Sequence, residues 1–178
     1  HTRDADISMS GGSEKTNYYF SVSYNDTKGI VRGNELTKIN ARTNVSHKFS
    51  DKFSLSMNLG FNRSKIDRIA NDNAFVTPLQ AIAQAPISPA FLDGEPFSNT
   101  VYPNFLLEDK YGFFTTIIRR ATGKISGDYK IIPNLKFTSS FAFDSFAQTE
   151  DQFRGSKTPF QSTNGEGTAT NAVSYTHL

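Results

Sequence analysis

The feature that most constrains this chain is a strict alternation of apolar and polar residues over residues 53–62. The apolar positions are Phe53, Leu55, Met57, Leu59 and Phe61, and the positions between them are Ser54, Ser56, Asn58, Gly60 and Asn62. Successive side chains of a β-strand point to opposite faces, so the pattern predicts a strand with one apolar and one polar face. An α-helix would spread the same residues around its whole circumference.

The alternation recurs along the chain, which predicts an antiparallel all-β fold of about six strands. The chain is rich in Phe (16) and Tyr (7), and aromatic residues favour strands. The predicted strands lie at about residues 4–10, 17–24, 38–49, 53–62, 116–131 and 135–144.

Connections between these strands alternate between short and long. Residues 11–16, 50–52 and 132–134 form short turns rich in turn-forming residues. The other connections are longer, at about residues 25–35, about 67–115 and from about 151 onward. All short turns therefore lie at one end of the sheet. This asymmetry is typical of an up-and-down transmembrane β-barrel with short periplasmic turns and long extracellular loops. A soluble sandwich predicts shorter strands and more even turns.

Other function classes lose support from the composition. The 19 basic and 17 acidic residues are interspersed at a net charge of +2, so we expect no nucleic-acid partner. No run of apolar residues is long enough for a transmembrane helix. Cysteine is absent, the three histidines are scattered, and no catalytic or nucleotide-binding motif appears. We therefore expect no enzyme activity, no cofactor and no metal site.

Several segments, taken in order, resemble the SusC/RagA group of TonB-linked outer-membrane transporters. Residues 8–24 followed by 29–34 carry the most specific part of this resemblance. Residues 41–45, 53–65 and 78–89 are similar to that group in the same succession, so the resemblance covers roughly residues 3–160.

The resemblance implies that residues 1–160 are part of a barrel domain, contributing early strands and a long extracellular loop at about 67–115. Residues 161–178 are expected to be a truncated loop, and the end of that segment resembles a translated sequencing adapter. The start without Met suggests an internal fragment. The family's plug, through which the TonB complex acts, is then expected to lie outside this sequence.

The same resemblance implies a function and partners. It implies import of oligosaccharides or peptides across the outer membrane of a bacterium, in contact with membrane lipid, with a SusD-like surface lipoprotein closing over the external loops. Two alternatives stay open. A soluble β-rich carbohydrate-binding or adhesin module would hold Phe53, Leu55 and Phe61 in a closed core. A passive porin would need neither plug nor lipoprotein.

Polar residues in the predicted lumen-facing phase could contact substrate or plug, but we expect most of them to hydrate the wall or to pair with one another. No substrate-binding residue is therefore assigned. These lumen-facing residues are Arg42, Asn44, Asn58, Asn62, Arg120, Lys124, Asp128 and Asp144. His47 falls in the opposite, lipid-facing phase and is expected in the interfacial belt.

The long loop is rich in proline and aromatic residues. Thr77 as a cap and Pro78 at the first helical position predict a short helix that ends before Pro86. The loop aromatics could stack on sugars or pack against a lid, but we expect them mainly to pack the loop onto itself. They are Phe91, Phe97, Tyr102, Phe105, Tyr111, Phe113 and Phe114.

Overall fold

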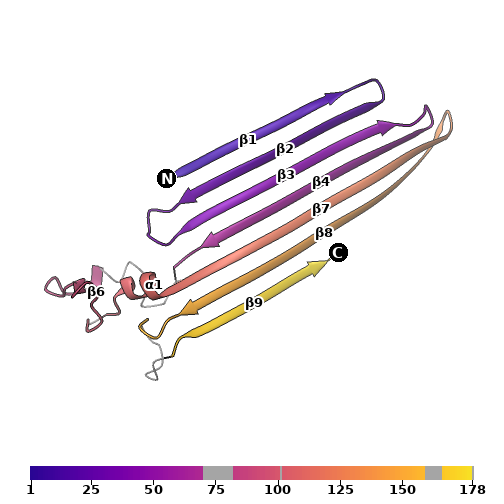
Figure 1. Ribbon diagram of the computed structural model, residues 1–178. Coiled ribbons are helices and arrows are strands. Elements are labelled where there is room, and N and C mark those ends of the chain that lie inside the picture. The colour runs from indigo at the N-terminus through magenta and orange to yellow at the C-terminus, as the bar shows by residue number, and fades with distance from the viewer. Residues whose placement is uncertain (70–81, 101, 159–165, 178) are drawn as a thin grey trace.

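A computed structural model describes residues 1–69, 82–100, 102–158 and 166–177 of the chain. Its main element is one antiparallel sheet whose seven strands lie in the order β1-β2-β3-β4-β7-β8-β9 (Figure 1). The strands are β1 (Thr2–Gly12), β2 (Thr16–Lys28), β3 (Glu35–Lys48), β4 (Phe53–Asp67), β7 (Gly112–Ile132), β8 (Leu135–Arg154) and β9 (Thr168–His177). Each strand pairs with the next in sequence except where β4 passes to β7, so the predicted all-β, up-and-down antiparallel fold is confirmed.

The connection between β4 and β7 carries the remaining elements. These are a two-stranded hairpin of β5 (Phe91–Leu92) and β6 (Glu95–Pro96), and one short helix, α1 (Phe105–Tyr111). Figure 1 shows them beyond the end of the sheet, on the same side as the β2–β3 and β8–β9 connections. The tight turns lie at the opposite end, so the predicted asymmetry of connections is present in the structure (Figure 1).

Two features of the fold differ from expectation. Residues 168–177 form a seventh strand that pairs with β8 from Ser145 to Arg154, where the sequence was expected to form a loop. Half of the helix predicted after Thr77, residues 78–81, lies outside the described residues, and the described half contains only a short helical turn at residues 82–83. Helix α1 itself was not predicted.

The register of the sheet places the apolar phases of neighbouring strands on one face. Val22 pairs with Ala41, which pairs with Phe61, and Phe61 pairs with Ala121. No register shift interrupts this alignment, because the only irregularity between the described strands lies between Lys130 and Ile132, at the turn end of β7. The predicted alternation therefore produces a continuous apolar face and a continuous polar face.

Glycine at position 123 makes room for an aromatic ring on the apolar face. Gly123 pairs with Phe143, and a Cβ atom at position 123 would lie 2.1 Å from Cε1 of that ring. By contrast, the nearest atom to a Cβ at Gly127 would lie 3.7 Å away, on the Phe53 ring. Gly123 is thus required by close packing, whereas Gly127 is not.

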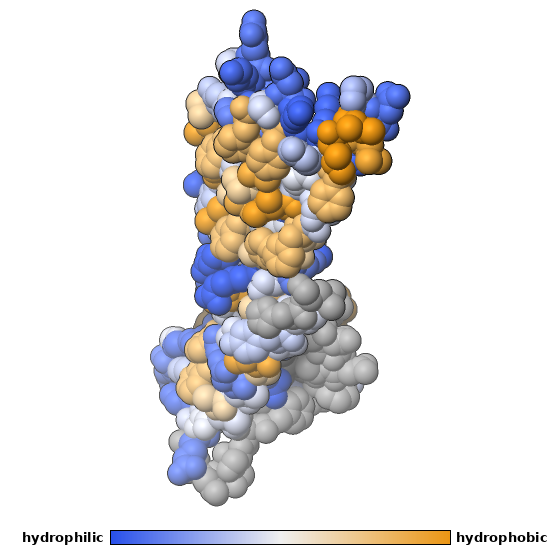
Figure 2. Space-filling view, turned by 90° about the vertical axis from the view of Figure 1, so that its right-hand side faces the viewer, coloured by the Kyte–Doolittle hydropathy of each residue, from blue (hydrophilic) through white to orange (hydrophobic). Residues whose placement is uncertain are grey.

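Within the part of the chain that the structure describes, the sheet has no second layer and no hydrophobic core. Among the described residues Leu107 of α1 is the one buried hydrophobic side chain, at 6% exposure. Phe61 is 45% exposed and Phe141 is 68% exposed on the apolar face. Figure 2 shows hydrophobic side chains gathered in a belt with hydrophilic ones at both ends. No helix among the described residues has the length and hydrophobicity to cross a membrane.

Candidate functional site

The polar face carries a ladder of side-chain hydrogen bonds that crosses three strands. The Asn40 amide of β3 donates to the Ser23 hydroxyl of β2 at 2.9 Å, and the Asn62 amide of β4 donates to Asn40 Oδ1 at 2.6 Å. Ser64 then donates to Asn62 Oδ1 at 3.3 Å. These bonds pair neighbouring polar side chains with one another and restrain their orientation across the polar face.

Three of the predicted lumen-facing residues form ion pairs, and a fourth has a buried polar atom without a hydrogen bond to the described residues. Arg120 forms a bidentate ion pair with Asp144 across the β7–β8 pair. Asp128 pairs with Lys136 at 2.9 Å. Asn44 Oδ1 is buried without a hydrogen-bond partner among the described residues.

Six of the eight predicted lumen-facing residues line one shallow hollow. The hollow includes Gly60, which lies in the row between Arg42 and Thr122 and has the Thr122 hydroxyl 2.8 Å from where its Cβ would be. Asp128 lies apart from it, near the short turns, with Lys48, Lys130 and other residues. The residues that line the hollow from the predicted set are Arg42, Asn44, Asn58, Asn62, Arg120 and Lys124. Their contact with any substrate stays a prediction.

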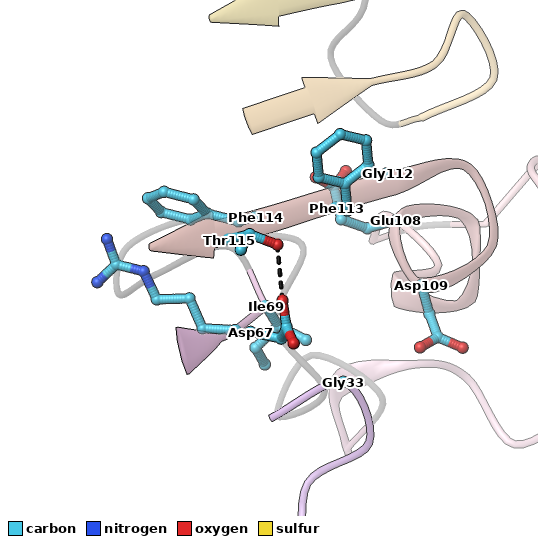
Figure 3. A pocket seen from close by; sticks show the side chains of 10 residues that line it. Gly33, Asp67, Ile69, Glu108, Asp109, Gly112, Phe113, Phe114 and Thr115 are labelled. Atoms are coloured by element: carbon cyan, nitrogen blue, oxygen red, sulfur yellow. Dashed lines mark hydrogen bonds between the residues drawn. The ribbon is translucent and has the colours of Figure 1, made fainter. Parts of the chain in front are cut away.

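A second, smaller cavity of about 170 Å³ lies at the base of the long loop, between the ends of β4 and β7 and helix α1 (Figure 3). In Figure 3 the Asp67 carboxylate points to Thr115, whose hydroxyl donates to it at 2.6 Å. Arg68 lies over the Phe114 ring, with 3.9 Å between the guanidinium carbon and the ring centroid. These contacts close the end of the sheet beneath the loop, and none of them involves a residue pair that is close in sequence.

Helix α1 is fixed at its start by Asn104. The Asn104 carboxamide oxygen accepts from the Leu106 amide at 3.2 Å, which is the usual N-cap interaction. Its Nδ2 donates to the carbonyl oxygens of Ala90 and Phe97, each at 3.0 Å. A single buried side chain therefore caps the helix and ties it to both sides of the β5–β6 hairpin.

Ion pairs connect α1 to distant parts of the chain. Asp109 pairs with Arg32 of the β2–β3 loop at 2.9 Å, and Glu108 pairs with Arg154 of β8 at 3.5 Å. Glu108 is 8% exposed, and its Oε2 atom has no hydrogen-bond partner among the described residues. Burial raises the pKa of the Glu108 carboxyl, and the Arg154 guanidinium offsets part of this rise.

The β5–β6 hairpin is joined to α1 by a more exposed pair. Glu95 pairs with Lys110 at 2.8 Å and accepts a hydrogen bond from the Tyr111 hydroxyl. The hydrogen bond from Lys110 lowers the pKa of the Glu95 carboxyl, and the Tyr111 hydrogen bond adds to this effect. The loop base thus contains two carboxylates whose pKa values are shifted in opposite directions.

The loop aromatics divide between packed and open positions. Phe113 stacks on Phe153 with ring centroids 5.8 Å apart, and Phe114 lies beneath Arg68. Phe91 and Tyr102 are exposed, at 54% and 37%, and Phe113 is itself 56% exposed despite its stacking contact. The two ring contacts join Phe113 and Phe114 to β8 and to the end of β4. The role expected of the loop aromatics, packing the loop onto itself, stays a prediction.

His47 lies where the sequence placed it, in the apolar phase near the short turns. Its ring packs edge-on against Phe49, with centroids 4.5 Å apart, and its Nδ1 is 2.7 Å from the Thr16 hydroxyl. No group of acidic, histidine or cysteine residues suited to hold a metal ion occurs in the described ranges. Sequence reasoning missed the ionic contacts of α1, because they join residues far apart in the chain.

The fold and its two faces define the class of structure: a segment of an antiparallel barrel-type sheet, apolar on one side and hydrogen-bonded polar on the other. Comparisons with known proteins agree with this class. The sequence is 29% identical to TonB-dependent receptor P26 of Formosa agariphila, over 92% of this chain and 17% of that receptor. No family model matches the sequence.

Solved structures of the RagAB peptide importer share the fold. The closed-closed state matches 99% of this chain and 21% of the importer chain, with a TM-score of 0.71 and 19% identity. The open-open state matches the same shares with a TM-score of 0.70 and 19% identity. The predicted resemblance to SusC/RagA-type TonB-linked transporters is confirmed. The chain spans about a fifth of the length of these relatives.

Proposed function

We propose that this chain forms part of the barrel wall of a TonB-dependent transporter in a bacterial outer membrane. The observation that carries the proposal is the apolar face, which stays in register across the sheet although no layer formed by the described residues covers it. An exposed apolar surface of this extent is stable only against an apolar surrounding. A lipid bilayer is such a surrounding, and the polar face would then line the lumen.

A soluble binding module does not fit this arrangement. That alternative needs Phe53 and Phe61 in a closed core, whereas they are 37% and 45% exposed on an uncovered face. A passive porin shares the two-faced wall. The similarity to a TonB-dependent receptor and to a peptide importer favours energised import over passive diffusion.

In this proposal the chain has no catalytic role, and its cargo is a peptide or an oligosaccharide. A SusD-like lipoprotein would close over the long loops, and the loop base would hold those loops in place. The RagAB structures are described as a peptide importer, which makes peptides the first cargo to test. The TonB complex would act on a plug, and the wall described here would serve as its surrounding frame.

Uptake in a strain that lacks the complete gene tests this function. Labelled peptides and labelled oligosaccharides are supplied in parallel, with and without the restored gene. We expect restored, TonB-dependent uptake of one class and co-purification of a surface lipoprotein with the transporter. Uptake that persists without TonB would favour a passive porin and contradict the proposal.

A further inference from the structure

Arg63 of β4 and Arg119 of β7 face each other directly on the apolar face of the sheet. They are cross-strand partners, one alternation beyond the apolar pair of Phe61 and Ala121. The same row continues on β3 with Ile39 and on β8 with Ala147. Further out, Tyr24 pairs with Ile39, and Tyr175 pairs with Ala147. Two cations therefore lie side by side in a row that is otherwise apolar or aromatic.

Like charges placed directly opposite each other destabilise a sheet. Neither Arg63 nor Arg119 forms an ion pair with a carboxylate in the described ranges of the chain. The adjacent Arg120, on the polar face, has the carboxylate of Asp144 as its partner. The chain thus neutralises a neighbouring arginine but leaves the outward pair without a counter-charge.

The position of the pair indicates where a counter-charge could come from. Rows on the turn side of the pair are apolar, including Met57 with Ile125 and Phe61 with Ala121. On the loop side the same face becomes polar, and the acidic residues Asp67 and Asp151 lie in the row of Thr115. Asp67 lies four positions beyond Arg63 along β4, which corresponds to about 13 Å along the strand. The arginine row therefore marks the boundary of the apolar band.

We propose that Arg63 and Arg119 together bind the phosphate of a lipid headgroup in the leaflet on the long-loop side. The inference rests on the proposed function, because it requires the apolar face to contact a bilayer. Lipid phosphates lie at the edge of the hydrocarbon layer, at the level of this row. The planar guanidinium group binds phosphate through two parallel hydrogen bonds, and two such groups around one phosphate remove their mutual repulsion.

Two neighbouring features fit a lipid better than a free ion. Tyrosine is enriched at the headgroup level of membrane proteins, and Tyr24 and Tyr175 occupy the same row as the arginine pair. The apolar row below, which includes Phe61 and Val22, would contact the acyl chains of the same lipid. A free phosphate would gain nothing from that apolar surface.

Native mass spectrometry of the full-length transporter, delipidated in detergent, tests the proposal. The probes are bisphosphorylated lipid A, the same glycolipid without its phosphates, and inorganic phosphate. We expect lipid A to bind the wild type. We expect the R63Q/R119Q variant to bind it at least about tenfold more weakly. The matched control is R42Q, which removes an arginine from the opposite face and should bind lipid A like the wild type.

Heat modifiability on gels shows whether each variant is folded, so a loss of binding is read only from folded protein. An R63K/R119K variant keeps the charges without the planar fork and should fall between wild type and R63Q/R119Q. Unchanged lipid A binding by R63Q/R119Q would overturn the proposal. Equal binding of the dephosphorylated glycolipid, or displacement of lipid A by an equal concentration of inorganic phosphate, would also overturn it. The proposed function fails separately, if a label at Leu55 in a bilayer contacts water and not lipid.

Discussion

The sheet and the base of the long loop are stabilised in different ways. The sheet has a continuous ladder of backbone pairs, and its described residues form no buried core, so its apolar side chains depend on the surrounding medium. The loop base contains buried Leu107, a capped helix and ion pairs between distant segments. The sheet should therefore respond to changes in apolar surface, whereas the loop base should respond to single polar groups and to pH.

Placing a charge in the apolar face should have the largest effect. Leu59 lies in the middle of the band, opposite Gly123 and Thr43. In the proposed membrane wall, Leu59→Arg would bring a guanidinium into the hydrocarbon. An arginine at the bilayer midplane costs about 2–4 kcal/mol. We expect a large drop in the folded fraction of full-length protein in the outer membrane, measured by heat modifiability.

The control for this change is Ser56→Arg on the polar face, where Ser56 pairs with Ser46 and Ser126. That variant should fold like the wild type, because its guanidinium would meet water. Equal loss in both variants would mean that the two faces do not have different surroundings.

Adding a side chain at Gly123, where the Phe143 ring packs against the backbone, should have the next largest effect within the sheet. A Cβ there would lie 2.1 Å from the Phe143 ring, so Gly123→Ala must displace the ring, at a cost of about 1–3 kcal/mol. Gly127→Ala, with its nearest atom at 3.7 Å, should be neutral or slightly stabilising. Urea unfolding in lipid vesicles measures both variants. Adding Phe143→Ala should remove most of the difference between them, and a persistent difference would contradict the packing explanation.

Removing the cap of α1 should affect the loop base and leave the sheet intact. Asn104→Ala removes the N-cap bond and both bonds to the hairpin, and the loss of a cap costs about 0.5–2 kcal/mol. We expect faster hydrogen exchange in residues 104–111 and unchanged exchange in β4 and β7. Exposed Asn99→Ala is the matched control. If β4 exchanged faster as well, the loop base and the sheet would not be independent.

The smallest effects should come from the carboxyl groups of Glu108 and Glu95, whose pKa values are shifted in opposite directions. The folded pKa of Glu108 is raised by burial. Its desolvation cost is therefore fully present above that raised pKa and disappears as the pH falls through it. The folded pKa of Glu95 is lowered by Lys110. Its stabilisation is therefore present above the ordinary carboxyl pKa and is lost as the pH falls through the lowered pKa.

At neutral pH we therefore expect Glu108→Gln to slow hydrogen exchange in α1 and Glu95→Gln to accelerate it. Each variant should also lose the corresponding part of the pH dependence between neutral and mildly acidic conditions. Changes of the same sign in both variants would show that burial does not dominate at Glu108.

The sheet could be predicted from sequence because its signal is local. Alternation over residues 53–62 fixes which side chains share a face, and the turn lengths fix the direction of each strand. Strand β9 was missed although Ala169, Val173 and Tyr175 alternate with polar residues, because the end of the chain resembled an adapter. Its place beside β8 depends on the pairing partner as much as on its own residues.

The loop base could not be predicted in the same way. The cap at Asn104 leaves a sequence signal, since asparagine is a preferred N-cap residue, but α1 is too short to show a helical period. The pairs of Asp109 with Arg32 and Glu108 with Arg154 join segments whose proximity only the folded sheet creates. The Arg63–Arg119 pair likewise could not be recognised without the register between β4 and β7.

A scan of nitroxide labels through β4 tests most directly whether one face of the sheet contacts lipid and the other contacts water. The chain has no cysteine, so single cysteines can be placed at each of residues 53–62 of the full-length protein once any others are removed. Collisions with oxygen, which concentrates in lipid, are compared with collisions with a water-soluble nickel complex. If the apolar face contacts lipid and the polar face water, oxygen maxima are expected at Phe53, Leu55, Met57, Leu59 and Phe61, with nickel maxima at the residues between them. Uniform exposure to nickel along the strand, or low collision rates with both reagents at Leu55 and Leu59, would contradict this arrangement.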